Sequence, residues 1–192
     1  MAVTLVAPGE VAVVVTRLEM RRRPLPAPLP PSPLRLQRWP APKPAAYRAL
    51  FRRVGAPWLW FSRLAISDDH LAAVLAAPGC AVHVAVDRAG VELGLVELMV
   101  APQETHIAYF ALVPELTGQQ IGRWLMAETL ARAWGRTTER VWLNTCSADH
   151  PKALGFYRAQ GFEPVQRFVE SFPDPRRTGL LPIDCAPHIP LI

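Results

Sequence analysis

The residues best suited to chemistry lie in a loop between a predicted strand and a predicted helix. The loop, Thr117-Gly118-Gln119-Gln120-Ile121-Gly122-Arg123, follows Leu112-Val113-Pro114-Glu115-Leu116. Backbone amides at the start of a helix lack partners within it, and together with the helix dipole they bind phosphate groups. We therefore expect this loop to bind a pyrophosphate. An ordinary strand-to-helix turn, with Gly118 supplying backbone freedom, explains the loop alone equally well.

A second segment, about 30 residues further on, favours the functional interpretation. It reads His150-Pro151-Lys152-Ala153-Leu154-Gly155-Phe156-Tyr157-Arg158-Ala159-Gln160-Gly161-Phe162. This segment resembles the second motif of the GNAT superfamily of acyl-CoA-dependent N-acyltransferases, in which Phe-Tyr is followed by three residues and Gly-Phe. The loop at 117–122 looks like the acyl-CoA loop of that superfamily. The resemblance covers about residues 81–170, where the expected order of strands and helices also matches.

The likeness is closer to bacterial members of the superfamily. The pieces that carry it are Tyr109-Phe110, Pro114-Glu115, Arg140-Val141-Trp142-Leu143, Thr145-Cys146, Asp149-His150-Pro151 and Ala153-Leu154. Two loop positions depart from the superfamily pattern. Thr117 stands where Arg or Gln is usual, and Gln120 stands where the first Gly is usual. A side chain at Gln120 would crowd the backbone where it approaches the pyrophosphate.

The resemblance implies an N-acetyltransferase that moves an acetyl group from acetyl-CoA to a primary amine by direct attack in a ternary complex, without a metal. It implies that a backbone amide near Leu112 or Val113, where the strand splays from its neighbour, stabilises the oxyanion and that the strand pairs with the pantetheine arm. It assigns Tyr157 as the acid that protonates the leaving thiolate. Asn144 and His150 are expected to contact the cofactor, although His150 beside Pro151 also suits a helix cap.

For the base that deprotonates the amine, the sequence offers Glu97 and His106 on two consecutive predicted strands. In a hairpin of simple register they project from one face, and the carboxylate would raise the pKa of the imidazole above about 6.5. The alternatives are a solvent-facing histidine and a glutamate paired with an arginine.

An aromatic run, Trp58, Trp60 and Phe61, follows the first predicted helix, where the superfamily places a segment that covers the acceptor. Aromatic side chains there suit a pocket for an apolar or aromatic amine, whereas tryptophans in a small domain more often belong to the core. We expect one tryptophan in the core and the other in the pocket.

Hydrophobic periodicity predicts the elements that position these residues. Period-two patterns predict strands, and helical spacing with stop signals predicts helices. Strands are expected at 11–20, 34–39, 81–87, 93–100, 105–113, 140–145 and 162–170, and helices at 44–54, 67–75, 118–134 and 151–160. The prediction is a single α+β domain over 1–192, with a mostly antiparallel sheet between helices in three α/β/α layers. The N-terminal strand and proline-rich connector take up about 1–43, the acyl-CoA core about 81–170, and an irregular tail about 173–192.

Composition and charge bear on the expected partners and the expected cell compartment. The formal charge of +5 comes largely from Arg21-Arg22-Arg23 and Arg52-Arg53, without the interleaved aromatic residues of a base-stacking surface, so nucleic acid is not the expected partner. No apolar run of about 18 residues or basic leader is present, and three separated cysteines suit a reducing cytoplasm. We expect a cytoplasmic monomer or homodimer whose acceptor is a small-molecule or peptide amine. A catalytically silent acyl-CoA- or peptide-binding module on the same fold is the alternative.

Overall fold

The structure, a computed structural model, describes residues 3–192 and contains one seven-stranded sheet within them. The strands are β1 (Glu10–Met20), β2 (Arg35–Arg38), β3 (Cys80–Val86), β4 (Glu92–Val100), β5 (Glu104–Leu112), β6 (Arg140–Cys146) and β7 (Glu163–Pro173). The α-helices are α1 (Pro44–Gly55), α2 (Asp68–Ala76), α3 (Ile121–Ala133) and α4 (Ala153–Ala159). Each expected strand and helix is therefore present, with shifted ends.

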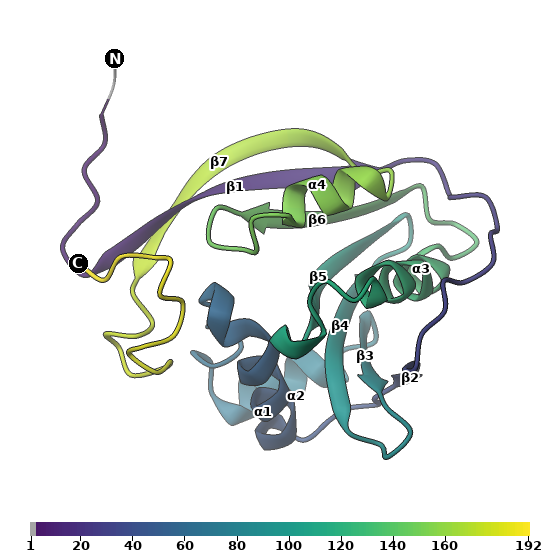
Figure 1. The fold of residues 1–192 in the computed structure, drawn as a ribbon, viewed down its shortest axis with the longest axis horizontal. Coiled ribbons are helices and arrows are strands. Elements are labelled where there is room, and N and C mark those ends of the chain that lie inside the picture. The colour runs from purple at the N-terminus through teal and green to yellow at the C-terminus, as the bar shows by residue number, and fades with distance from the viewer. Residues whose placement is uncertain (1–2) are drawn as a thin grey trace.

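The sheet order is β2-β3-β4-β5-β6-β1-β7, and every neighbouring pair is antiparallel except β5 and β6. Buried side chains form two clusters, one with residues of α1 and α2 and the other with residues of α3. Figure 1 shows α1 and α2 to the left of β3 and β4 and α3 to their right. Side chains of α4 pack with the cluster of α3. The predicted α+β class with a mostly antiparallel, three-layer arrangement is confirmed.

The first strand lies far from the second in the sheet. β1 is inserted between β6 and β7, whereas β2 pairs with β3 at the opposite edge. The proline-rich stretch at 24–33 has no regular structure and connects the two halves, because proline lacks the amide that a central strand needs. The sequence predicted the strand and the connector but not this position.

Local signals explain the helices next to the site. Pro44 occupies the first turn of α1, where its missing amide costs no hydrogen bond, and Tyr47, Leu50, Phe51 and Val54 form its buried face. Ser67 caps α2, since its hydroxyl accepts a hydrogen bond from the His70 amide at 3.2 Å. No helix in residues 3–192 is long and apolar enough to cross a bilayer.

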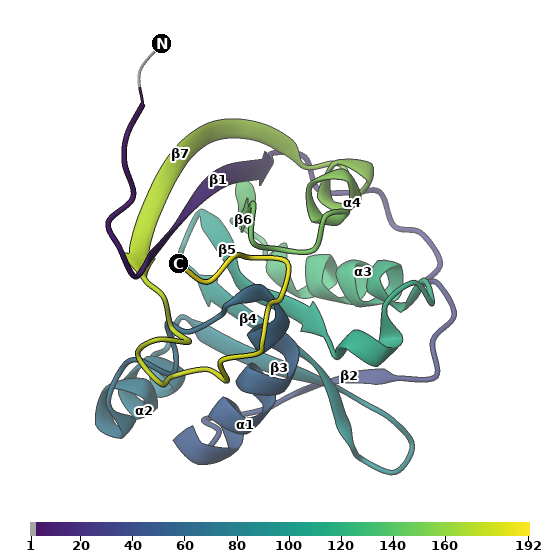
Figure 2. The ribbon, with the colours of Figure 1, turned by 60° about the vertical axis from the view of Figure 1, so that its left-hand side comes forward.

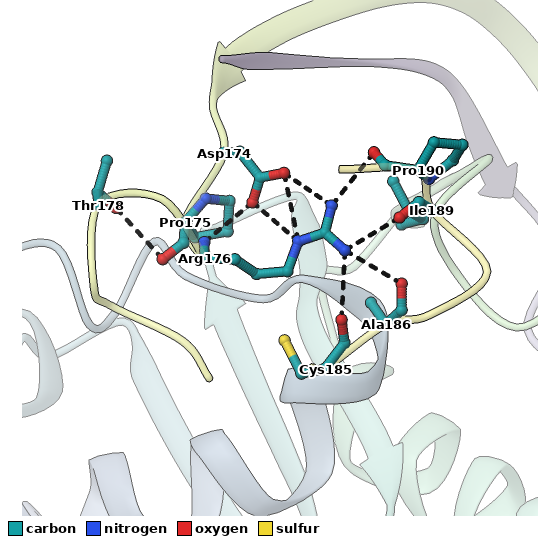
Figure 3. A network of polar contacts seen from close by, with 8 residues as sticks. All are labelled: Asp174, Pro175, Arg176, Thr178, Cys185, Ala186, Ile189 and Pro190. Carbon is teal, nitrogen blue, oxygen red and sulfur yellow. Dashed lines mark hydrogen bonds and ion pairs between the residues drawn. The ribbon is translucent and has the colours of Figure 1, made fainter. Parts of the chain in front are cut away.

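The C-terminal tail has no helix or strand, yet it is held in place by one buried guanidinium. Arg176 forms an ion pair with Asp174 at 2.7 Å, and only 5% and 2% of these residues are exposed. Its remaining donors reach four backbone carbonyl oxygens further along the tail (Figure 3), those of Cys185, Ala186, Ile189 and Pro190. Figure 2 shows the tail running along the side of the sheet that carries α1 and α2.

We expect Arg176→Met to lower the free energy of unfolding by about 3–5 kcal/mol, because it leaves the buried Asp174 carboxylate without its charged partner. The adjacent and exposed Arg177→Met should change it by less than about 0.5 kcal/mol. Urea unfolding of both variants measures the difference. Equal stabilities would show that the buried pair does not fix the tail.

Candidate active site

The site begins where the two parallel strands at the centre of the sheet separate. β5 and β6 pair only through Glu104 with Arg140, Thr105 with Val141, and His106 with Trp142. Beyond His106, β5 continues to Leu112 and β6 continues to Cys146 without pairing with each other. The facing edges of the two strands therefore offer backbone groups that an extended ligand can bind.

A β-bulge lies at the start of this gap. β4 and β5 change register between Glu97, which pairs with Tyr109, and Leu98, which pairs with Ile107. The additional residue, Ala108, has no partner in the pairing with β4. Ala108 lines the cavity of the candidate site, so the bulge lies where the β5 backbone borders that cavity.

The loop after β5 leaves the N-terminus of α3 open. Gly118 and Gln120 have φ angles of 83° and 61°, in the left-handed region. Because of these two residues, α3 begins at Ile121 and not at the predicted Gly118. No side chain caps this helix, and a Cβ atom added at Gly118 would meet nothing within 4 Å. The first amides of α3 and the space before them therefore fit a phosphate group.

The loop, the separated strands and the aromatic segment enclose a cavity of about 430 Å³. Most of the residues proposed from sequence line it. They are Trp58, Trp60, Leu112, Thr117, Gly118, Gln120, Gly122, Arg123, Asn144, His150 and Tyr157.

Four other predicted contacts do not line this cavity. Ile121, the first residue of α3, is buried in the core. Gln119 bonds through its side-chain amide to the Glu115 carbonyl oxygen at 2.9 Å. Phe61 packs on Phe172 of β7, with ring centroids 4.9 Å apart.

Val113 is the fourth, and the idea that its amide is a free oxyanion donor is wrong. That amide donates to the Leu93 carbonyl oxygen at 2.9 Å. The Leu112 amide faces away from β4, because successive amides of an antiparallel pair alternate in direction, so Leu112 stays a candidate donor. The irregular backbone lies earlier in the strand, at Ala108.

The predicted pairing of Glu97 with His106 is also wrong. The Glu97 side chain is 0% exposed, and its oxygens bond to the Tyr47 hydroxyl and to the Arg63 guanidinium, each at 2.5 Å. The register change at the bulge places Tyr109 opposite Glu97 and Met99 opposite His106. The alternative of a glutamate paired with an arginine describes Glu97 correctly.

His106 lies flat on Trp142, with ring centroids 3.7 Å apart and planes within 7°. Burial, with the nearby Arg17 charge, lowers the pKa of His106 to about 4, opposite to the expected rise. The imidazole is therefore neutral at neutral pH and has no carboxylate partner in Glu97.

Tyr157 lies among the aromatic rings of the α3 side and faces the cavity. Its ring contacts Phe110, Phe156 and Phe162, with centroids 5.4–6.2 Å away. Burial raises the pKa of the phenol, and the charge of Asp149 raises it further. The hydroxyl therefore keeps its proton at neutral pH and can donate a hydrogen bond into the cavity.

The two tryptophans form the opposite wall. Trp60 lies close to Gly55, where a Cβ atom would come within 2.6 Å of the Trp60 side chain, so only glycine permits this position. Trp58 contacts His150 on one side and His188 of the tail on the other, at centroid distances of 5.3 and 5.8 Å. Both tryptophans line the cavity, and Trp60, unlike Trp58, also packs against the core beside α1, so the expected core tryptophan contributes to both.

Sequence reasoning used Asp149 only as part of a family motif and missed it as a site residue. It lies in the loop between β6 and α4 and lines the cavity. Its Oδ2 accepts hydrogen bonds from the Thr145 hydroxyl at 2.7 Å and the Cys146 amide at 2.9 Å. The Trp60 indole, 89 residues away in sequence, lies 3.5 Å from Oδ1. The only sequence signal was an acidic residue next to His150, which does not show that it meets Trp60.

Comparison with known proteins identifies the family. Residues 33–162, more than half of the chain, match the acetyltransferase (GNAT) family. The chain therefore belongs to this family, whose members are acetyltransferases that use acetyl-CoA. No curated protein matches the chain.

Solved structures share the fold at low sequence identity. An aminoglycoside acetyltransferase from an uncultured soil metagenomic sample, in complex with trehalose, superposes with a TM-score of 0.58 and 22% identity over 71% of this chain and 94% of that chain. A protein of unknown function from Staphylococcus epidermidis gives 0.55 and 16%, over 85% of this chain and 62% of its own. A GCN5-related N-acetyltransferase from Sphaerobacter thermophilus gives 0.55 and 19%, over 87% and 52%. The chain thus spans 62% and 52% of the lengths of the last two, respectively.

The strained Gln120 backbone gives a direct test of the loop geometry. We expect Gln120→Gly to be more stable than Gln120→Ala by about 1 kcal/mol, because both remove the side chain but only glycine adopts a positive φ without steric cost. Urea unfolding compares the two variants. If the alanine variant is equally stable, residue 120 does not hold the left-handed conformation.

Proposed function

We propose that the protein transfers an acetyl group from acetyl-CoA to a primary amine, with both substrates bound at once in the cavity. The observation that carries the proposal is the continuous surface from the open N-terminus of α3 to the gap between β5 and β6. The end at the N-terminus of α3 suits a phosphate group, and the gap between β5 and β6 suits the extended pantetheine arm of acetyl-CoA. The far end, with Trp58, Trp60 and Asp149, is left for the acceptor.

The chemistry at the phosphate end supports acetyl-CoA. Arg123 of α3 lines the cavity beside the loop, so one cation accompanies the free amides of α3. The Thr117 hydroxyl adds a donor on the same side. When bound, acetyl-CoA supplies a thioester whose carbonyl carbon an amine can attack.

The chain's own residues suit the requirements of that attack. A backbone amide at the Ala108 bulge is our candidate oxyanion donor, because it lies where the strand leaves its regular pairing. Tyr157 is the candidate acid, because its phenol stays protonated and faces the same cavity.

The second candidate function is that of a catalytically inactive acyl-CoA-binding module. The presence of glutamine at position 120 favours it. A side chain with a left-handed backbone stands at the loop position where the family usually has glycine. Such a module would bind acetyl-CoA without acetylating any amine. Turnover assays with a panel of primary amines separate the two candidates.

Charge repulsion tests the phosphate site. Gly118→Asp and Gly118→Asn introduce side chains of the same size and the same positive-φ cost, so they differ only in charge. We expect the aspartate variant to bind acetyl-CoA at least about 10-fold more weakly than the asparagine variant, as measured by calorimetry. Equal affinities would place the pyrophosphate elsewhere.

Tyr157→Phe tests the acid, because it removes a single oxygen atom from a ring that otherwise keeps its packing. We expect kcat to fall by about 100-fold while the dissociation constant of acetyl-CoA changes little. Tyr109→Phe, which removes the hydroxyl that contacts Ser62, should give a much smaller loss. An unaltered kcat in Tyr157→Phe would assign protonation of the thiolate to solvent or another group.

A further inference from the structure

Among residues 3–192, Asp149 supplies the only carboxylate that lines the cavity. It lies beside Trp60, at the end of the cavity that Trp58 and Trp60 bound. Glu97, expected to orient the base His106, bonds to Tyr47 and Arg63 instead. His106 stacks on Trp142 and does not line this cavity. An amine that enters this end of the cavity therefore meets one negative charge.

The two oxygens of Asp149 have different surroundings. Oδ2 accepts two hydrogen bonds of ordinary length, from the Thr145 hydroxyl and the Cys146 amide, and these fix the orientation of the carboxylate. Oδ1 has a single, long contact of 3.5 Å with the Trp60 indole nitrogen. A carboxylate oxygen accepts about two hydrogen bonds, so Oδ1 has capacity for an amino group.

We propose that Oδ1 of Asp149 binds the amino group of the acceptor and accepts the protons it loses, and that the acceptor is a primary monoamine on an apolar or aromatic body. This inference rests on the proposed function, because it concerns the acceptor end of the same cavity.

The aromatic wall defines the body of the acceptor. Trp58, Trp60 and Tyr109 present ring surface beside Asp149, and such surface favours apolar and aromatic groups. A polyamine such as an aminoglycoside would bring several cations to a cavity with one carboxylate. Lys152, which follows Asp149 by three residues and also lines the cavity, would add repulsion. A monoamine matches the single charge.

Protons and bonds balance in this arrangement. The entering ammonium passes one proton through Asp149 to solvent, and the neutral nitrogen then attacks the thioester carbon. As the C–N bond forms, the second nitrogen proton goes to Asp149. As the C–S bond breaks, Tyr157 gives its proton to the sulfur, and protonated Asp149 restores it. The products are an amide, a thiol and one proton.

The surroundings of Asp149 predict how the rate depends on pH. Burial raises the pKa of this carboxyl, although the Cys146 amide and the Thr145 hydroxyl oppose the rise. The titratable groups around it are the Cys146 thiol of β6, the Tyr157 phenol of α4 and the neighbouring His150. Because the base form is the carboxylate, the rate should rise with pH through this raised pKa.

The first test measures binding without turnover. Tryptophan fluorescence in the presence of coenzyme A should show 2-phenylethylamine binding at least about 10-fold more tightly than its neutral analogue 2-phenylethanol. Asp149→Asn keeps the size and the Oδ2 acceptor but removes the charge, and should abolish the preference. Asp69→Asn, the same change at an exposed site on α2, should keep it. No saturable amine signal in the parent, or a preference that survives Asp149→Asn, overturns the proposal.

The second test is the pH profile of acetylation. Asp149→Asn should lower kcat by about 100-fold or more and remove the acidic limb. Thr145→Val removes a hydrogen bond that favours the carboxylate, and should shift that limb to higher pH. If Asp149 had only a structural role, these variants would lower the rate without moving the acidic limb of the pH profile. That result overturns the proposal.

The two tests separate this inference from the proposed function. Charge-dependent amine binding without acetylation of any amine supports Asp149 as the amine site and contradicts acetyl transfer. Acetylation that keeps its rate and pH profile in Asp149→Asn supports acetyl transfer and contradicts the role of Asp149.

Discussion

The candidate site depends on one feature of the sheet, which is that β5 and β6 pair over only the first three residues of their shared length. Two parallel strands in the middle of a sheet normally satisfy each other's backbone groups along their whole length. Here the pairing stops after His106 and Trp142, and the Ala108 bulge lies just beyond that point. This gap provides unpaired backbone in the centre of the fold, next to the open N-terminus of α3. We assign each proposed role according to the part of the cavity, around this gap, that the residue lines.

The walls of the gap come from distant parts of the chain. β1 holds β6 from the far side, so the position of β6 does not depend on complete pairing with β5. The tail, fixed by Arg176, places His188 beside Trp58, and the His188 ring nitrogen lies 3.2 Å from the Ala148 carbonyl oxygen. The loop that carries Asp149 is thus supported by the last residues of the chain. The acceptor end is assembled by tertiary contacts, whereas the phosphate end is built by one continuous segment.

That difference explains what the sequence could predict. Strands, helices and the phosphate loop follow from local patterns, and the prediction of residues 117–123 needed only a strand, glycine and a helix in succession. The insertion of β1 between β6 and β7 depends on non-local pairing, which local periodicity does not encode. The bulge adds one residue to β5, and this separates Glu97 from His106 despite their suitable spacing. Asp149 meets Trp60 only in the folded chain.

The most direct test of the central claim is a crystal structure of the protein with acetyl-CoA. The account predicts the pyrophosphate at the amides that begin α3, the pantetheine arm between β5 and β6, and the thioester carbonyl oxygen at an amide of the Ala108 bulge. Acetyl-CoA bound outside this gap, or β5 and β6 pairing along their full length in the crystal, would contradict it.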